Sequence, residues 1–368
     1  MVTIRKQSVT LICSQVLCLA FVAAVFFLSK QSAAAETEAV PVADTSATSA
    51  DSSTSAEMAE KPTDANNSTS TSTADNTTTD NKTTESSAVV SPELKWVEDY
   101  NQAMNQAVEE KRLMLVHFYR PSDQQRAEAA DAGDSVVNIE AAVNQPGVRE
   151  KLSSYVLTKL PLDAQAVVKG EKIHLLDHGA FSELHKGPGI AVIDLLHEGT
   201  EYYGYVVSIL RFTPGKYYRF NPKHLETMVN LPAGTLTQRS MVFAVRIHPE
   251  HPASTEGQEN PVLLSEATDH SDYQARVHVQ GHQDWESRFH RILGKLLGRG
   301  EHGMPVEVVA ESWPDQDLMD SCVDCVASWR QSEGHWNAVK AKQASYGYDI
   351  REGTNGIWYA TGIFREPQ

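Results

Sequence analysis

Positive charge is scarce in this chain. Its 368 residues include 32 lysines and arginines against 48 aspartates and glutamates, which gives a formal net charge of −16 at pH 7. No cluster of basic residues interrupts this excess of negative charge. Proteins that bind nucleic acid neutralise its phosphates with lysine and arginine side chains. We therefore exclude nucleic acid as a partner.

Cysteine is also rare, and several common catalytic motifs are missing. The four cysteines are Cys13, Cys18, Cys322 and Cys325. The chain contains no H-E-x-x-H, no G-x-S-x-G and no phosphate-binding loop. These absences argue against a zincin-type protease, a hydrolase with a nucleophile elbow and a P-loop nucleotide hydrolase.

A targeting segment is predicted over residues 1–35. Arg5 and Lys6 precede a mostly apolar run over 9–28, and Ala33–Ala35 offers a signal-peptidase site. The apolar run is also near the ~20 residues that span a bilayer. The segment is therefore either a cleaved signal peptide or a retained membrane anchor. In both cases we expect the rest of the chain to be exported, as a secreted, periplasmic or surface protein, with membrane contact only through an uncleaved anchor.

Residues 36–91 lack the side chains that build a core. They contain no aromatic residue, no leucine and no isoleucine, and ten acidic residues face two lysines. Such a segment cannot bury enough apolar surface to offset the entropy that it would lose on folding. We predict a disordered linker whose negative charges repel one another.

Strand and helix patterns alternate over residues 92–230, which predicts an α/β domain. Trp96, Tyr100, Met104 and Ala107 recur at helical spacing. Strands are predicted over 113–118, 155–162 and 190–194, with a further strand near 201–207, and helices over 139–152, 175–184 and 221–229.

This order of elements resembles the thioredoxin fold. The stretch KWVEDYNQAMNQAVEEKRLMLVHFY is similar to the opening of thioredoxin-like domains, and Pro188 matches the family's cis-proline. The family's redox cysteines are missing, because Asp123 and Arg126 fall where the two thiols would be. Thiol–disulfide exchange needs a reactive thiolate, so we expect a domain that serves binding or only structure. His117 falls inside a strand pattern and is predicted to be a packed histidine.

Prolines punctuate residues 231–260, which we predict to be a linker between two domains. Residues 236–248 within it could form one strand. The second domain is predicted over 261–368. Trp285, Phe289 and Ile292 indicate a helix face, and further helices are expected around SCVDCVASWRQS and HWNAVKAKQ. The segments SYGYDI and NGIWYATGIF are expected to form antiparallel strands.

The end of the chain resembles the CAP superfamily, the cysteine-rich secretory, antigen 5 and pathogenesis-related proteins, whose domain is also called SCP. The resemblance rests on the order of AESW, SWRQSEGHW, YGYDI and GIWYATGIF. It implies an α-β-α sandwich with a central antiparallel sheet, and a cleft that in several members binds zinc between two histidines and acidic side chains. The front of the domain is short compared with the family pattern.

Transferred by position, the resemblance implies a metal site. His335 matches the histidine of the family's Gly-His, and Glu311 matches the glutamate of Gly-Glu-Asn. His302 is the candidate second histidine, for which His282 competes. Ser332 stands at the second acidic position and Ser312 at the asparagine, so the quartet is incomplete. The alternative is a hydrogen-bonded cluster that only tethers helix to sheet.

Cys322 and Cys325 form a C-x-x-C in the middle of a predicted helix. A redox motif should follow a strand and open a helix, and two cysteines supply only half of a four-cysteine zinc site. We expect either a local disulfide or two buried thiols. A redox or folding helper that uses this pair is the weakest of three functional hypotheses.

The leading hypothesis is an exported, non-catalytic binding protein whose CAP-like domain has a candidate divalent-metal cleft. Its ligand could be a lipid, a wall polymer or a protein. The alternative is a metal-dependent hydrolase that uses His335, Glu311 and His302, because three protein ligands on a zinc ion leave a position for water.

Overall fold

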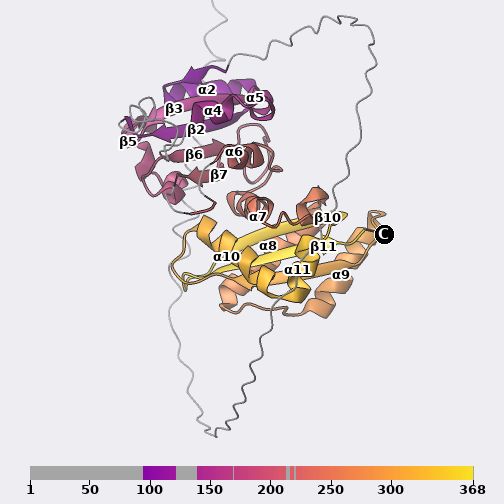
Figure 1. Cartoon of the computed structure of the whole chain (residues 1–368). Coiled ribbons are helices and arrows are strands. Elements are labelled where there is room, and N and C mark those ends of the chain that lie inside the picture. The colour runs from indigo at the N-terminus through magenta and orange to yellow at the C-terminus, as the bar shows by residue number, and fades with distance from the viewer. Residues whose placement is uncertain (1–93, 122–138, 169, 213–215, 219–220, 368) are drawn as a thin grey trace, which may run out of the picture. The chain divides into compact units, whose positions relative to one another are not determined.

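A computed structural model describes most of the chain beyond residue 93 (Figure 1). The described residues are 94–121, 139–168, 170–212, 216–218 and 221–367. The predicted targeting segment and linker, and the positions of Asp123 and Arg126, lie outside them. The chain divides into the units Met1–Val90 and Ser91–Gln368, and the second unit is described below. It has mixed α/β content with several sheets.

The first sheet has five strands in the order β1-β3-β2-β6-β7. Three of them are parallel to one another: β1 (Trp96–Val97), β3 (Tyr155–Pro161) and β2 (Leu113–Tyr119). β6 (Gly189–Ile193) and β7 (Val206–Arg211) run antiparallel to their neighbours. β2, β3 and β6 are almost continuously buried because both faces of the sheet are covered.

Helices cover the two faces of this sheet. α2 (Tyr100–Glu110) begins after Asp99, whose side chain accepts the Gln102 N–H, and it packs over the face that buries Met114, Val116 and Phe118. The opposite face meets α4 (Ile139–Val143), α5 (Pro146–Leu152) and α6 (Pro222–Val229). The single helix expected over 139–152 is two helices, because Pro146 starts a new one.

The connections of this sheet differ from expectation in two places. The helix expected over 175–184 is a pair of 3₁₀ turns, η1 (Leu175–Asp177) and η2 (Gly179–Leu184). The peptide bond that precedes Pro188 is trans, as are all peptide bonds in the described residues. A short hairpin of β4 (Gln165–Val168) and β5 (Glu171–His174) stands apart as its own sheet.

His117 is packed, as predicted. Its ring lies 5.9–6.3 Å from the rings of Trp96, Tyr119 and Phe212, and only 5% of its surface is exposed. Nδ1 has no hydrogen-bond partner. Burial, with a smaller effect from nearby Lys159, lowers the pKa of His117 to about 3, so the ring is neutral at pH 7.

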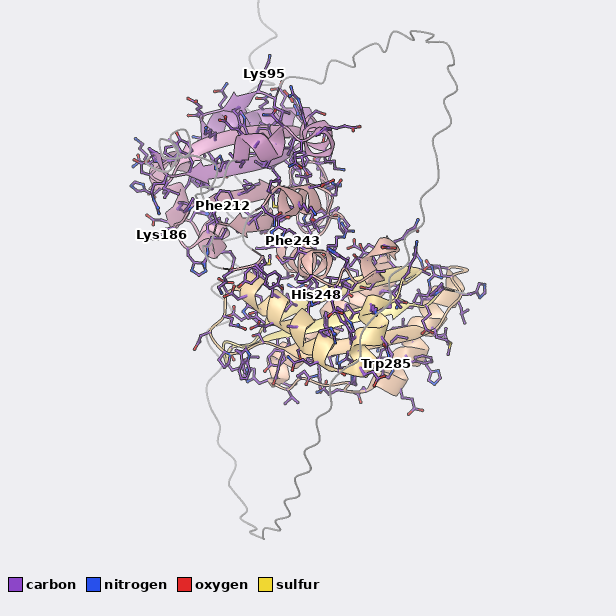
Figure 2. The ribbon with its side chains drawn as sticks, in the orientation of Figure 1. Lys95, Lys186, Phe212, Phe243, His248 and Trp285 are labelled. Atoms are coloured by element: carbon purple, nitrogen blue, oxygen red, sulfur yellow. The ribbon has the colours of Figure 1, made fainter. Side chains whose placement is uncertain are left out.

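The strand suggested for residues 236–248 is wrong. The segment is the helix α7 (Leu236–Ile247), which begins with a capping box between Thr235 and Gln238. Phe243, labelled in Figure 2, and Ile247 pack into a core of the first sheet. Other α7 residues, Met241, Val242, Ala244 and Val245, belong to the core of the second sheet. α7, which lies within the stretch predicted as a linker, therefore contributes to both cores.

The second sheet has four strands in the order β8-β10-β11-β9. β10 (Ser345–Glu352), β11 (Trp358–Arg365) and β9 (Pro305–Glu311) are antiparallel neighbours, as expected for β10 and β11, and β8 (Gln258–Glu259) pairs with β10 in parallel. The hairpin turn between β10 and β11 spans residues 353–357.

Helices lie on both faces of the second sheet (Figure 1). One face carries α8 (Pro261–Val277), with α9 (Trp285–Gly298) packed against it. The other carries α7, α10 (Leu318–Gln331) and α11 (Glu333–Lys340). Gly347 of β10 permits the close approach of α8, because a Cβ at this position would lie 2.3 Å from a backbone nitrogen of that helix. No helix in the described ranges is long and apolar enough to cross a membrane.

Candidate functional site

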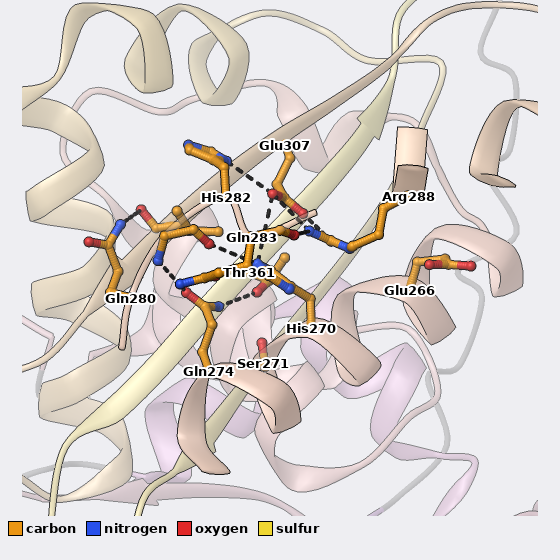
Figure 3. Close-up of polar contacts among 12 residues, drawn as sticks. Glu266, His270, Ser271, Gln274, Gln280, His282, Gln283, Arg288, Glu307 and Thr361 are labelled. Carbon is orange, nitrogen blue, oxygen red and sulfur yellow. Dashed lines mark hydrogen bonds and ion pairs between the residues drawn. The ribbon is translucent and has the colours of Figure 1, made fainter. Parts of the chain in front are cut away.

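Two histidines and a buried glutamate meet beside β9. His282 comes from the loop between α8 and α9, Glu307 from β9 and His335 from the first turn of α11. The loop is fixed at two points, because Gly281 donates its N–H to Gln274 Oε1 at 3.0 Å and the Gln280 amide donates to the Val309 carbonyl at 3.5 Å. This loop therefore holds His282 against the strand (Figure 3).

The imidazole of His282 is engaged at both of its nitrogens. Its Nδ1 lies 3.0 Å from Glu307 Oε1, and its Nε2 lies 3.3 Å from His335 Nε2. A carboxylate oxygen accepts, so the contact with Glu307 places a proton on Nδ1 of His282. In the neutral ring Nε2 is then bare, with its lone pair directed toward His335. The side chain of His282 is 43% exposed, so this nitrogen pair stands at the rim of the structure.

Glu307 is buried and fully engaged. Its side chain is 1% exposed, and Arg288 of α9 meets both carboxylate oxygens, with Nη1 3.1 Å from Oε1 and Nη2 against Oε2 (Figure 3). The guanidinium of Arg288 provides the positive charge that a buried carboxylate requires. His270 approaches Oε1 to 3.9 Å, but its Nε2 donates to the Gly281 carbonyl at 2.9 Å.

The surrounding histidines are held neutral. Burial lowers the pKa of His335 below its ordinary value, and the neighbouring His282 lowers it further. Burial likewise lowers the pKa of His270. A neutral imidazole keeps one lone pair. While Nε2 of His335 donates its proton to the bare Nε2 of His282, that lone pair is on Nδ1. His335 can therefore offer Nε2 to an electrophile near pH 7 once its proton moves to Nδ1.

The three predicted metal ligands are not brought together. His302 precedes β9, and Glu311 is the last residue of that strand. The seven residues of β9 alone extend about 20 Å at ~3.3 Å per residue, so one ion cannot bind both side chains. The His302 carbonyl accepts from Arg365, and Glu311 is exposed beside Tyr359. Only His335 of the predicted trio is in the cluster, and its partner histidine is His282, the competitor of His302.

Sequence reasoning missed Glu307. The family pattern pointed to Glu311, which lies four residues further along the same face of β9, about 13 Å away. A signal was present in PVEVVAE, where Glu307 lies between valines and every residue but the terminal Glu311 is otherwise apolar. A charge in such a position must be paired when it is buried.

Cys322 and Cys325 are free thiols, not a disulfide. Both are fully buried in the middle of α10, which is continuous across them. Burial raises the pKa of both thiols well above the ordinary range. A thiol in this state is a poor nucleophile, which argues against the redox hypothesis.

Within the part of the chain that the structure describes, no group of three or more histidine, cysteine, aspartate or glutamate side chains is arranged to hold a metal ion. The cluster thus offers two nitrogen ligands with a carboxylate behind one of them. Comparisons with protein-family models and with curated proteins found no match.

Proposed function

We propose that this chain is an exported, non-catalytic binding protein that holds a divalent transition metal between His282 and His335. The observation that carries the proposal is the 3.3 Å separation of their Nε2 atoms. Two nitrogens bound to one tetrahedral zinc ion at ~2.0–2.1 Å are about 3.4 Å apart. The pair therefore already has the spacing of two ligands of one ion.

The groups around the pair fit this role. A metal-bound histidine usually donates its other ring N–H to a carboxylate, which fixes the ring and makes the ligand more basic. Glu307 accepts the Nδ1–H of His282 in this way. Imidazole suits zinc, copper, nickel and iron rather than magnesium or calcium, which prefer oxygen. The metal would supply a Lewis-acidic centre when bound.

Two protein ligands leave further coordination positions for other groups. Water would fill them in the free protein, and a donor group on a bound ligand would replace it. The exposed position of His282 supports access by a large partner, and the three ligand types expected from the sequence, lipid, wall polymer and protein, all carry oxygen donors. Binding is therefore the function that this geometry favours.

Catalysis by the predicted trio has less support. His302 and Glu311 lie at opposite ends of β9, and Glu307 is held by Arg288 and His282. A general base needs a carboxylate that is free to accept a proton from water, and these contacts restrain Glu307 from that role.

We extend the proposal to the architecture and location. The strand order of the first sheet, three parallel strands followed by two antiparallel ones, supports a thioredoxin-like domain over 92–230 that lacks redox cysteines. Helices on both faces of the second sheet support a CAP-like domain over 261–368. The apolar run at 9–28 supports export, with or without a retained anchor.

The test is a zinc titration of the whole protein by calorimetry. We expect one equivalent to bind, and His282→Ala or His335→Ala to abolish binding. His290→Ala, which removes an exposed histidine from α9, is the matched control, and His302→Ala and Glu311→Ala should also leave binding unchanged. Lack of binding in the unmodified protein, or loss of binding with His302→Ala, would overturn the proposal.

A further inference from the structure

Arg288 contacts two groups that position His282, the carboxylate of Glu307 and the backbone of the loop. Its guanidinium meets both oxygens of Glu307, and its Nη1 lies 3.4 Å from the Gln283 carbonyl, one residue after His282. The residue lies in the first turns of α9, is only 7% exposed, and packs 5.4 Å over the ring of Trp285. The arginine is therefore fixed before any ligand arrives.

A fork of two N–H groups fixes the plane of a carboxylate, whereas a single contact leaves it free to rotate. The plane matters here because Oε1 of Glu307 is shared between Arg288 and Nδ1 of His282. While Oε1 faces Nδ1, the proton of the neutral His282 ring resides on Nδ1. If the carboxylate rotates away, nothing in this contact prefers one tautomer over the other.

We propose that Arg288 is a positioning residue that fixes the tautomer of His282, so that Nε2 is the nitrogen offered to a ligand beside His335. The effect of the tautomer on metal binding rests on the function proposed above. The tautomer itself can be measured in the metal-free protein. Arg288 touches neither the bound ion nor His335 in this scheme and acts only through Glu307 and the loop.

Arg288→Lys is the informative variant, because lysine keeps the positive charge but cannot form the fork. Arg291→Lys is its matched control. Arg291 lies one turn further along α9 and forms a similar two-point contact with buried Glu266, at 3.1 and 2.6 Å, in a pair that does not include His282.

The first readout is the ¹H–¹⁵N spectrum of the histidine rings in the metal-free protein near pH 8, with His282 assigned by His282→Ala. We expect the Nδ1–H tautomer in the unmodified protein and in Arg291→Lys, and a measurable share of the Nε2–H tautomer in Arg288→Lys. The second readout is the zinc titration, in which Arg288→Lys should bind about 10-fold more weakly, the lower end of outer-shell effects.

The outcomes separate this inference from the proposed function. An Nε2–H tautomer in the unmodified protein overturns the inference, and this result does not depend on whether Arg288→Lys folds. An unchanged tautomer and affinity in Arg288→Lys also overturn it, while the metal site stands. If no variant binds zinc but the tautomer shifts as expected, the positioning role stands and the metal site is refuted.

Discussion

Glu259 should destabilise the fold at neutral and alkaline pH. It lies on β8, where it pairs with Tyr346 at the edge of the second sheet. Burial raises the pKa of its carboxyl to about 7, although Arg239 and Arg246 act in the opposite direction. In the unfolded chain the same group titrates at its ordinary value of 4.5.

The sign and size of the effect follow from these two values. Below pH 4.5 the carboxyl is neutral in both states and costs nothing, whereas above pH 7 the folded protein must hold the charge in a desolvated position. The cost therefore grows as pH rises from 4.5 to 7. At ~1.36 kcal/mol per pH unit it would reach about 3 kcal/mol at pH 8. Partial solvent screening of this half-buried group reduces it to about 2 kcal/mol.

Replacement by glutamine removes the charge at nearly constant shape. We expect Glu259→Gln to raise the free energy of unfolding by about 2 kcal/mol at pH 8 and by less than about 0.5 kcal/mol at pH 4.5. Urea unfolding followed by tryptophan fluorescence at both values would measure the difference. Glu256→Gln, three residues earlier and exposed, should have little effect at either pH. A gain that is equal at both pH values, or a loss at pH 8, would refute the reasoning.

Three further predictions concern other buried positions. With Cys13 and Cys18 replaced by serine, Cys322 and Cys325 should resist a thiol reagent such as DTNB in the native protein and react with two equivalents in denaturant. Fast native labelling would contradict their burial. Gly347→Ala should cost about 3 kcal/mol in urea unfolding, because a backbone contact cannot be relieved by a side-chain rotation. Gly294→Ala, on the open side of a helix, should gain about 0.5–1 kcal/mol. The buried imidazole of His117 resists protonation in the folded state, so the free energy of unfolding should fall as the pH is lowered from 6.5 to 4. His117→Phe should reduce this loss by about 3 kcal/mol. The same loss in the variant, measured by urea unfolding at the two pH values, would argue against this.

The local patterns predicted much of the first sheet but not α7. Runs such as Leu113–Tyr119 are short, apolar and flanked by turns, so their length alone indicates strands. In α7, nine of twelve residues are buried, so no polar face shows the helical period. The start signal was present, since Thr235 and Gln238 have the spacing of a capping box. Burial on several sides, a tertiary property, hid the helix.

Part of the candidate site could also be predicted from local sequence, and part could not. His335 was identified because its Gly-His lies in a sequence motif that is local. The pairing of His282 with Glu307 depends on how a loop between two helices folds over a strand that is 25 residues away in sequence. No spacing rule covers such a contact. Arg288 becomes relevant only when the buried carboxylate of Glu307 is known to need a partner.

The sharing of α7 between two cores sets a limit on how this protein can be divided. A fragment that ends before Leu236 would leave the first sheet without Phe243 and Ile247, and would expose the apolar surface that they cover. A fragment that starts after Ile247 would remove Met241 and Val245 from the second. Neither fragment would have a complete hydrophobic core. Proteolysis or truncation near this helix should therefore yield aggregation-prone pieces rather than two soluble domains.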